Sequence, residues 1–449
     1  MTSGSPIKLI LKFSLPLLLG NLLQQMYNMI DAAIVGRVLG ADALAGVGAS
    51  SSVQFLVLGF CMGICAGFSI PVAKYFGAEQ YERLRTCIFN AYLMTGAFAV
   101  LLTIPTALFC RNILNIMATP ANIYDDAYIY LLIIFLGIPF ILFYNLLAGI
   151  MRAVGDSRTP FIFLMISAFL NIFLDIMFIA VIRLGCAGAA LATVIAQAVS
   201  GIACFIYIQK KYPLLRLKRQ YCKFNFYAIK ELFIMGIPMG LQYSITAIGS
   251  MVMQSANNGL GSSYVSGFTA ASKIKQLAMC PFDAIATGVS VFTSQNLGAG
   301  KPERIRKGIF NGVAVGAGYG AVIGLVLIFF GRPLSLMFIK SSETAVLAAS
   351  AQYLMCAGFF YWLLGILNTT RMTIQGLGYS AVAIFSGVIE MIARIAVSKA
   401  FVPKFGFWAI CFTDQAAWIL ATIYCSIVCE VCIRKVSKNH TKLQFNAAK

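Results

Sequence analysis

Two acidic residues, Asp31 and Asp175, lie inside long apolar stretches of the sequence. An ionised carboxylate at the centre of a bilayer costs at least about 2.5–3.5 kcal/mol, so such groups persist mainly where they face a cavity, a counter-ion or a proton path. In the first stretch, Asn21, Gln24 and Asn28 precede Asp31 at steps of three or four residues, which places all four on one helix face. This spacing predicts a polar face that lines a cavity.

The second acid has polar neighbours at helical spacing. Asn171 and Asp175 are one turn apart and share a face, and Thr193 lies on the following apolar stretch. Counted from the outer ends of their helices, Asp31, Asp175 and Thr193 all lie about 9–12 Å below the outer surface. Two carboxylates, an amide oxygen and a hydroxyl form either an oxygen-rich site for a hard cation or a pair of acids that share a proton. The alternative is a structural role, in which these groups form hydrogen bonds between helices.

Further charges occur in the second half of the chain. Glu390 and Arg394 are four residues apart, which predicts an intramembrane ion pair because partnering lowers the cost of both charges. A structural role is the first interpretation of this pair, and ion coupling or substrate contact is the second. Arg371, near the inner end of its stretch, is expected to reach the headgroups. Asp283 is a weaker candidate for a cavity-facing acid, and Asp414 gives no functional indication.

Composition dictates the elements that must position these groups. Of the 449 residues, 60% are hydrophobic and 11% are charged, a balance that a water-soluble domain of this size could not sustain. Apolar segments of roughly 18–25 residues, each long enough to cross a hydrocarbon core of about 30 Å, recur along the chain. The sequence therefore predicts an all-α integral membrane protein with twelve transmembrane helices. The expected spans are 10–35, 50–73, 88–110, 127–150, 160–182, 187–208, 229–254, 268–295, 308–330, 347–374, 380–401 and 408–432.

The formal charge of +19 follows the expected membrane topology. With the N-terminus in the cytoplasm, most basic residues fall in loops on that side, which predicts a multi-pass protein of the cell membrane with both termini cytoplasmic. Membrane lipid is thus an expected partner, and nucleic acid is not. The thirteen cysteines are scattered and the sole histidine, His440, lies near the C-terminus, so no metal or disulfide framework is expected.

The chain repeats itself at an offset of about 221 residues. The segment 77–90, GAEQYERLRTCIFN, matches 298–311, GAGKPERIRKGIFN, at eight of fourteen positions. Each half holds six predicted spans, an even number, so the two halves form a parallel repeat. The predicted organisation is an N-lobe over 1–208 with helices 1–6, a basic cytoplasmic linker over 209–228, a C-lobe over 229–434 with helices 7–12, and a cytoplasmic tail over 435–449.

Over nearly its full length the chain resembles the multidrug and toxic compound extrusion (MATE) transporters. The resemblance is carried by residues 16–24, YNMID at 27–31, VGR at 35–37, ALA at 43–45, NLLAG at 145–149, GDSRTP at 155–160, NIFLD at 171–175 and QNLGAG at 295–300. It implies two six-helix lobes and antiport of Na⁺ or H⁺ against organic, often cationic, compounds.

The resemblance also assigns roles to residues in the N-lobe. It implies a cation or proton site at Asp31, Asn171, Asp175 and Thr193, with Gln24, Asn28 and Asn145 among the polar residues of the adjoining cavity. The chain departs from some branches of the family because residues 242–250 in helix 7 contain no acidic residue. Ion coupling is therefore expected in the N-lobe.

The expected function is secondary antiport that exports small organic compounds, mainly cationic drugs or toxins, in exchange for Na⁺ or H⁺. The protein is expected to need no cofactor beyond the coupling ion and to act as a monomer. A flippase for lipid-linked sugars is the nearest alternative, although such a protein often needs free cations in its cavity. An enzyme would require a cluster of reactive side chains near one interface, which the sequence does not offer.

Overall fold

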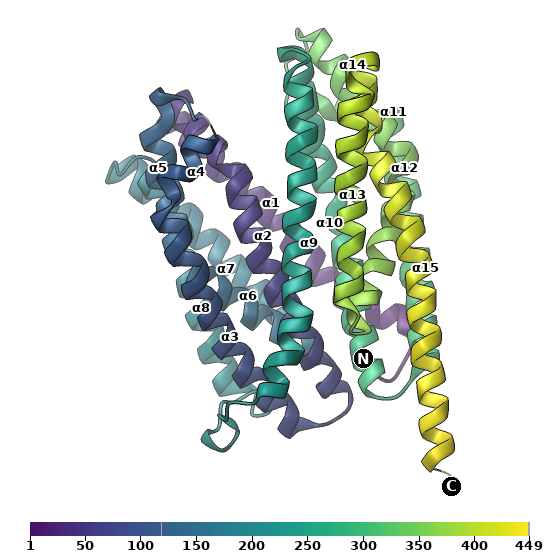
Figure 1. Cartoon of the computed structure of the whole chain (residues 1–449). Helices are drawn as coiled ribbons and strands as arrows, with labels where there is room; N and C mark the ends of the chain where they lie inside the picture. Colours follow the sequence, from purple (N-terminus) through teal and green to yellow (C-terminus); the bar gives the residue numbers. More distant parts are fainter. Residues whose placement is uncertain (118, 448–449) are drawn as a thin grey trace. The chain divides into compact units, whose positions relative to one another are not determined.

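The computed structural model describes residues 1–117 and 119–447, apart from the side chains of residues 41 and 439–447, so the side chain of His440 lies outside the description. The described residues form helices and no strand (Figure 1). Eleven helices are long and apolar enough to cross a membrane, and a bent pair of shorter helices brings the number to twelve. The predicted all-α fold with twelve membrane-spanning segments is confirmed.

The helices follow the predicted order of apolar segments. Their bounds are α1 Pro6–Val38, α2 Ala41–Gly77, α3 Tyr81–Leu108, α4 Cys110–Ile116, α5 Tyr124–Leu136, α6 Ile138–Ala153, α7 Arg158–Asp175, α8 Cys186–Lys211, α9 Phe226–Asn258, α10 Ser262–Gly298, α11 Pro302–Ser335, α12 Thr344–Gly376, α13 Ser380–Ala400, α14 Val402–Phe405 and α15 Phe407–Ala447. Single turns occur at Ala121–Ile123 and Arg219–Tyr221, and a π-helical segment, Ile176–Val181, continues α7.

The fourth predicted span is broken. Helices α5 and α6 meet at Gly137 with a bend of 48°. Proline at position 139, in the first turn of α6, lacks a backbone donor and is tolerated there. Gly137 also allows α8 to approach closely, because a Cβ added at this position would lie 2.3 Å from Cγ2 of Val194. The break therefore coincides with a close approach of α8 at Gly137 and with a proline in the first turn of α6.

The contacts of the chain divide it into two compact units. Unit 1 contains residues 1–18 and 241–449, and unit 2 contains residues 19–240. The first part of α1 therefore belongs with the second half of the sequence, and the first part of α9 belongs with the first half. Each change of unit falls two residues after a proline inside the helix, at Pro16 in α1 and at Pro238 in α9.

In unit 2, the first part of α9 packs on α2 through glycines spaced four residues apart on both helices. A Cβ added at Gly63 would lie 2.7 Å from Cα of Gly240, and one at Gly67 would lie 2.5 Å from Cα of Gly236. Small residues at this spacing let two backbones approach closely, which is how helices associate inside a membrane where lipid is as apolar as the side chains.

Polar contacts hold the same part of α9 at one end of unit 2. Glu231 accepts hydrogen bonds from Lys74 Nζ at 3.1 Å and from the Tyr75 hydroxyl at 2.5 Å. Asn90 on α3 binds the segment before α9, because its side chain donates to the carbonyl of Lys223 and accepts from the amide of Asn225. In Figure 1 the loops before α3 and before α9 lie at this same end of the unit.

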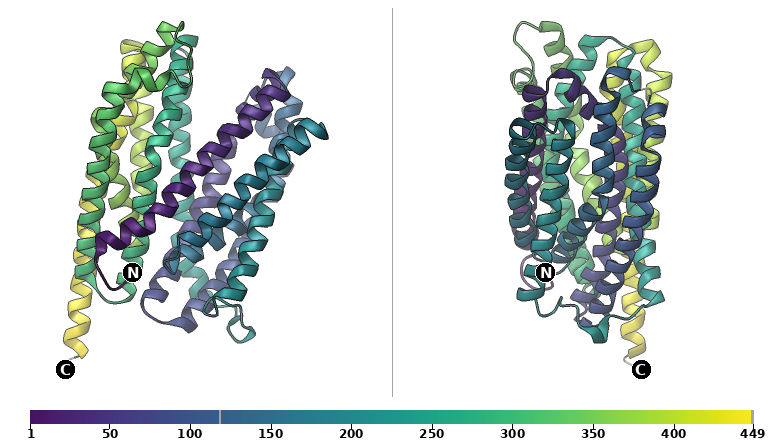
Figure 2. Two further views of the ribbon diagram at one scale, coloured as in Figure 1. Left: turned by 180° about the vertical axis from the view of Figure 1, so that it is seen from behind. Right: turned by 90° about the vertical axis from the view of Figure 1, so that its left-hand side faces the viewer.

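Unit 1 is built around α10, α11, α12 and α15, which lie side by side in Figures 1 and 2. The first part of α1 contacts α10, where a Cβ added at Gly288 would lie 2.6 Å from Oγ of Ser14. This contact corresponds, at the repeat offset, to that of α9 on α2. The last turns of α15 extend beyond the neighbouring helices (Figure 2).

Candidate functional site

The geometry around Asp175 begins with an irregularity in the backbone. Asp175 is the last residue of α7, and the π-helical segment Ile176–Val181 follows it directly. Segments of this kind are rare and occur frequently at functional sites, because the wider turn redirects the adjacent side chains. Helix α8 accommodates the segment at Gly188, where an added Cβ would lie 3.0 Å from Cβ of Phe178. The backbone therefore changes pitch at the residue that carries the buried carboxylate.

Three helices of unit 2 bring the four predicted coupling residues together. The amide nitrogen of Asn171 on α7 lies 3.4 Å from Oγ1 of Thr193 on α8, a long hydrogen bond. Asp31 on α1 and Asp175 on α7 are close enough for their carboxyl groups to interact directly. Asp175 is fully buried and Asn171 is 3% exposed, whereas Asp31 is half-buried. The structure thus forms two pairs, Asp31 with Asp175 and Asn171 with Thr193, and α7 joins them into one cluster because Asn171 and Asp175 lie one turn apart.

Several oxygens in this cluster make no hydrogen bond within the described chain. They are Oδ1 of Asp31, Oδ1 of Asn171 and both carboxyl oxygens of Asp175. Buried polar atoms are normally hydrogen-bonded, so each exception requires an explanation. Two carboxyl groups and an amide oxygen form a hard, anionic donor set that fits Na⁺, and the paired acids equally fit a shared proton. The residues present therefore suit either coupling ion.

A tyrosine that the sequence did not single out also belongs to this cluster. Tyr130 on α5 is 4% exposed and lies near both Asp31 and Asp175, with Gln54 as a further neighbour. Its hydroxyl adds a polar group beside the two acids. The sequence gives no local signal for it, because Tyr130 sits among apolar residues, 45 positions from Asp175 and on a different helix.

The three predicted cavity residues are less closely associated. Gln24 lies one turn before Asn28 on α1 and neighbours the hydroxyl of Tyr27, while Asn28 itself is exposed. Asn145 on α6 is half-buried, and its side chain donates to the carbonyl of Ile141 in its own helix at 2.8 Å. Among the contacts described for these side chains, none joins them to the four coupling residues.

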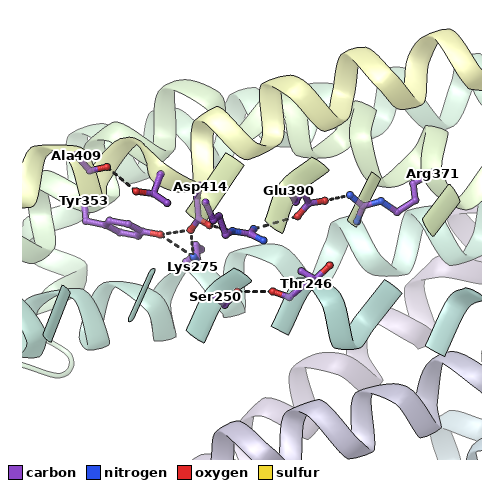
Figure 3. A network of polar contacts seen from close by, with 10 residues as sticks. Thr246, Ser250, Lys275, Tyr353, Arg371, Glu390, Ala409 and Asp414 are labelled. Atoms are coloured by element: carbon purple, nitrogen blue, oxygen red, sulfur yellow. Dashed lines mark hydrogen bonds and ion pairs between the residues drawn. The ribbon is translucent and has the colours of Figure 1, made fainter. Parts of the chain in front are cut away.

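Unit 1 holds a second polar cluster, drawn in Figure 3. Glu390 forms ion pairs with Arg371 on α12 and with Arg394, one turn away on α13, at 3.2 Å to the latter. Arg394 Nε lies 2.9 Å from Oδ1 of Asp414 on α15. Lys275 on α10 completes the cluster with its Nζ 2.6 Å from Oδ2 of Asp414.

The expectation for Arg371 is wrong. Its side chain does not extend to the headgroups but is 9% exposed and bonded to Glu390 inside the unit. The sequence also missed Lys275, Tyr353 and Asp414, which meet from three helices although Asp414 seemed uninformative. A lysine inside a long apolar helix was the one available signal. Asp283 is exposed and makes no ion pair among the described residues.

The model of the MatE protein family matches this chain over two segments, residues 16–177 and 238–398. Among curated proteins, "Probable multidrug resistance protein YpnP" of Bacillus subtilis (strain 168) is 30% identical over 415 residues, covering 91% of this chain and 90% of that protein. "Probable multidrug resistance protein YoeA" of the same organism is 28% identical and covers 82% of this chain and 80% of that protein.

Solved structures share the fold. One is described as the outward-facing conformation of a multidrug resistance MATE family transporter. Its TM-score is 0.91 at 21% sequence identity, and the match covers 96% of this chain and 97% of that transporter's chain. A second, described as MATE in the bent conformation, has a TM-score of 0.90 at 20% identity, with 98% of both chains covered. Both similarities extend over nearly the whole chain.

Proposed function

Because the chain belongs to the MatE family of multidrug efflux transporters, we propose that it is a secondary active antiporter that exports small organic compounds, mainly cationic, in exchange for Na⁺ or H⁺. The coupling site comprises Asp31, Asn171, Asp175 and Thr193. The observation that supports it is the pair of neighbouring carboxyl groups, in which Oδ1 of Asp31 and both oxygens of Asp175 are buried and make no hydrogen bond within the described chain. No chemical conversion of the substrate is part of this proposal.

The chemistry of the pair explains how an ion gradient would drive export. Two carboxylates in a low-dielectric environment repel each other, and one bound proton or Na⁺ relieves that repulsion. A substrate that carries a positive charge relieves the same repulsion. The ion and the substrate can therefore each supply the positive charge that the two carboxylates need. A protein that binds only one of them at a time exchanges them across the membrane.

Efflux from proteoliposomes tests the proposal. Ethidium efflux is measured under an imposed Na⁺ gradient and, separately, under an imposed H⁺ gradient. We expect one gradient to drive efflux in the wild type, and we expect Asp175→Asn to slow it by at least about tenfold, the factor that corresponds to about 1.4 kcal/mol. The matched control is Asp125→Asn, the same change at an exposed carboxylate at the start of α5.

The outcomes separate the candidate functions. Efflux that neither gradient drives, across a panel of organic cations, would contradict antiport and make lipid-linked sugars the next substrates to test. The flippase has less support, because Lys275, Arg371 and Arg394 of unit 1 are paired with Glu390 and Asp414 and are not free to hold a pyrophosphate. If Asp175→Asn slows efflux under one gradient more than under the other, the ion of the first gradient is the coupling ion.

The proposal includes the setting of the protein. It places the chain in the cell membrane as a monomer in contact with lipid, with both termini in the cytoplasm. The positive-inside distribution of Lys and Arg supports this orientation. Labelling of single cysteines introduced in the linker at Lys218 and in the α3–α5 connection at Asn122, both exposed, assigns the two faces in whole cells.

A further inference from the structure

The loop that joins α8 to α9, residues 212–225, and the adjoining helix ends carry positive charge only. Residues 209–230 include seven basic residues, all exposed, and no acidic residue. No ion pair joins any of the seven to an acidic side chain in the part of the chain that the structure describes. Such a surface attracts an anionic partner from outside the chain. The seven basic residues are Lys210, Lys211, Arg216, Lys218, Arg219, Lys223 and Lys230.

This loop is folded against unit 2. Leu215 is 2% exposed, and the guanidinium of Arg85 on α3 donates to the carbonyl of Leu214 at 3.0 Å. Near the other end of the loop, the side chain of Asn90, also on α3, donates to the carbonyl of Lys223 at 3.1 Å. The backbone that carries the basic side chains is therefore held in place, which lowers the entropy cost of binding a partner.

The acidic residues closest in sequence to the two ends of the loop contacts are already engaged within unit 2. Asp156 accepts a hydrogen bond from the hydroxyl of Tyr212, the first residue of the loop. Glu231, near the start of α9, accepts hydrogen bonds from Lys74 and from the hydroxyl of Tyr75. Neither carboxylate forms an ion pair with a basic residue of the loop among the described residues, so the loop keeps its positive charge for another partner.

Large aromatic side chains are exposed beside these charges. Phe224 is 71% exposed, Phe226 is 72% exposed and Tyr227 is 70% exposed. Both helices that the loop connects, α8 and α9, are long and apolar enough to cross a membrane, so the loop lies at a membrane surface. Aromatic rings beside basic residues are typical of segments in the membrane interface, where the rings lie among the lipids and the charges lie at the headgroups.

We propose that this loop is a binding surface for the anionic headgroups of phospholipids in the adjacent leaflet. The loop surface comprises Lys218, Arg219, Lys223, Phe224 and Phe226. The phosphate oxygens of the headgroups accept charge-assisted hydrogen bonds from the ammonium and guanidinium groups, and the two rings enter the lipid beside them. A soluble anion would use the charges alone and leave both rings in water. The inference involves neither the coupling ion nor the exported compound, so its test is independent of the proposed antiport.

A fluorophore within the loop surface reports the local lipid composition. Bimane is attached to Phe224→Cys, where its ring replaces the phenylalanine ring. The background is Cys222→Ser, because Cys222 is half-buried whereas the other twelve cysteines are buried. The protein is reconstituted into vesicles of phosphatidylcholine and phosphatidylglycerol, with one or the other lipid brominated. The ratio of quenching by the two brominated lipids, at equal mole fraction, gives the local enrichment of the anionic lipid.

Two controls accompany this measurement. Bimane at Val322→Cys, a position 64% exposed within the apolar helix α11, reports lipid away from the loop surface. The test variant combines Lys218→Gln, Arg219→Gln and Lys223→Gln. The matched variant removes the same number of positive charges from exposed lysines of unit 1, through Lys340→Gln, Lys399→Gln and Lys404→Gln.

We expect phosphatidylglycerol to be enriched at least about fivefold at position 224, as one basic group near an anionic surface would produce, and not at position 322. The enrichment should fall to about one in the test variant and persist in the matched variant. Salt at about 1 M, where the Debye length is about 3 Å, should also reduce it.

Equal quenching by the two lipids at position 224, or enrichment that survives in the test variant, would overturn the inference. Inorganic phosphate that abolishes the enrichment, at an ionic strength where NaCl does not, would assign the loop to a soluble phosphate compound instead of lipid. Elution of each variant as a single peak in size-exclusion chromatography distinguishes loss of lipid binding from loss of folding, and the salt series tests the wild type without any substitution of a basic residue.

Discussion

At Thr193 the choice between the two coupling ions can be tested with one hydroxyl group. The Thr193 hydroxyl and the Asn171 oxygen are useful ligands for Na⁺, but a proton shared by Asp31 and Asp175 does not need them. Thr193→Ala should raise the Na⁺ concentration for half-maximal efflux by about two- to tenfold, as expected for one lost polar contact of about 0.5–1.5 kcal/mol. Thr106→Ala is the control, because that hydroxyl bonds only within α3.

If the coupling ion is H⁺, the same substitution should leave the pH dependence of efflux unchanged. Loss of all gradient-driven efflux in Thr193→Ala, with the protein still folded, would contradict both expectations and assign the threonine a role in the structure of α7 and α8. The measurement is the initial rate of ethidium efflux at a series of Na⁺ concentrations and pH values.

Asp156, in the loop between α6 and α7, makes a prediction about acid stability. Burial raises the pKa of its carboxyl group, but hydrogen bonds from the Thr159 hydroxyl, the Tyr212 hydroxyl and two backbone amides outweigh burial, so the pKa lies below its usual value. Because its pKa is lowered in the folded state, the Asp156 carboxylate contributes its full stabilisation of the fold above the ordinary aspartate pKa of about 3.9. This contribution is lost as the pH falls below that value.

Asp156→Asn should therefore lower the unfolding temperature at neutral pH and reduce its dependence on pH below about 4. The carboxylate is partly exposed, so we expect a cost of about 1 kcal/mol for the lost hydrogen bonds. Thermal unfolding in detergent between pH 3 and pH 7 measures both quantities, and Asp125→Asn provides the comparison. A larger pH dependence in the variant than in the wild type would contradict this assignment.

The sequence is most informative about residues whose type conflicts with their surroundings. Asp31, Asn171, Asp175 and Thr193 could be proposed because polar groups at helical spacing interrupt apolar segments. The structure pairs Asp31 with Asp175 and Asn171 with Thr193, and their role in coupling stays a prediction. The Lys275 cluster was beyond reach. Lys275 is separated from Tyr353 by 78 residues and from Asp414 by 139, and periodicity within a helix carries no information about partners on other helices.

At the scale of helices, the α2–α9 contact gives a prediction about packing. Gly67→Ala should destabilise the protein by about 1–3 kcal/mol, because the added methyl group would lie 2.5 Å from the Gly236 backbone and cannot be accommodated by a side-chain rotation. Gly96→Ala on α3 meets no atom within 4 Å and should stabilise by up to about 1 kcal/mol through helix propensity. Thermal unfolding of the two variants compares crowding with propensity in the same unit.

A Gly67→Ala protein as stable as Gly96→Ala would show that α9 and α2 separate easily in solution. Reduced transport without reduced stability would point instead to a contact that must slide during the cycle. The two results require the unfolding temperature and the efflux rate of the same preparations.

Hydrophobicity located each of the candidate membrane-spanning helices, because length and composition determine whether a helix can cross lipid, although α2 begins at Ala41 where the predicted span began at residue 50. It did not reveal the 48° bend at Gly137 or the π-helical segment after Asp175. Both features lie where α8 approaches closely, Val194 beside Gly137 and Gly188 beside Phe178, and a single segment of sequence does not contain that information.

For the whole molecule, the composition of the two units predicts how a divided chain behaves. A break after residue 217 separates two fragments, and each fragment lacks a helical part that belongs to its own unit: residues 226–240 for unit 2 and residues 1–18 for unit 1. We expect the fragments to be poorly stable when expressed alone and to copurify when expressed together. Affinity purification through a tag on one fragment, followed by size-exclusion chromatography, measures this.

A second division provides the matched control. When the chain is divided after residue 240, the first fragment contains all of unit 2. The second fragment then lacks only residues 1–18 of unit 1. The first fragment should then be the more stable of the pair when expressed alone. Equal stability of the first fragments from both divisions would mean that residues 226–240 contribute little to unit 2.

The internal repeat predicted two halves of six spans each, and the MatE matches in each half agree with that duplication. Repetition in sequence identifies what was duplicated but not which segments pack together. The contact units exchange the first parts of α1 and α9, and this exchange arises from glycines, Ser14 and Glu231, whose partners lie in distant parts of the sequence. The organisation into lobes at 1–208 and 229–434 stays a prediction.

The exchanged helices also determine the order in which the protein can be completed during synthesis. Residues 1–18 emerge first, yet their partner at Gly288 is translated about 270 residues later. At about 5–20 residues per second, the start of α1 waits roughly 15–60 s for its binding surface. The first unit that can close is unit 2, when α9 has been translated. Slow elongation between α9 and α10 should therefore prolong the exposure of this segment to chaperones and membrane proteases.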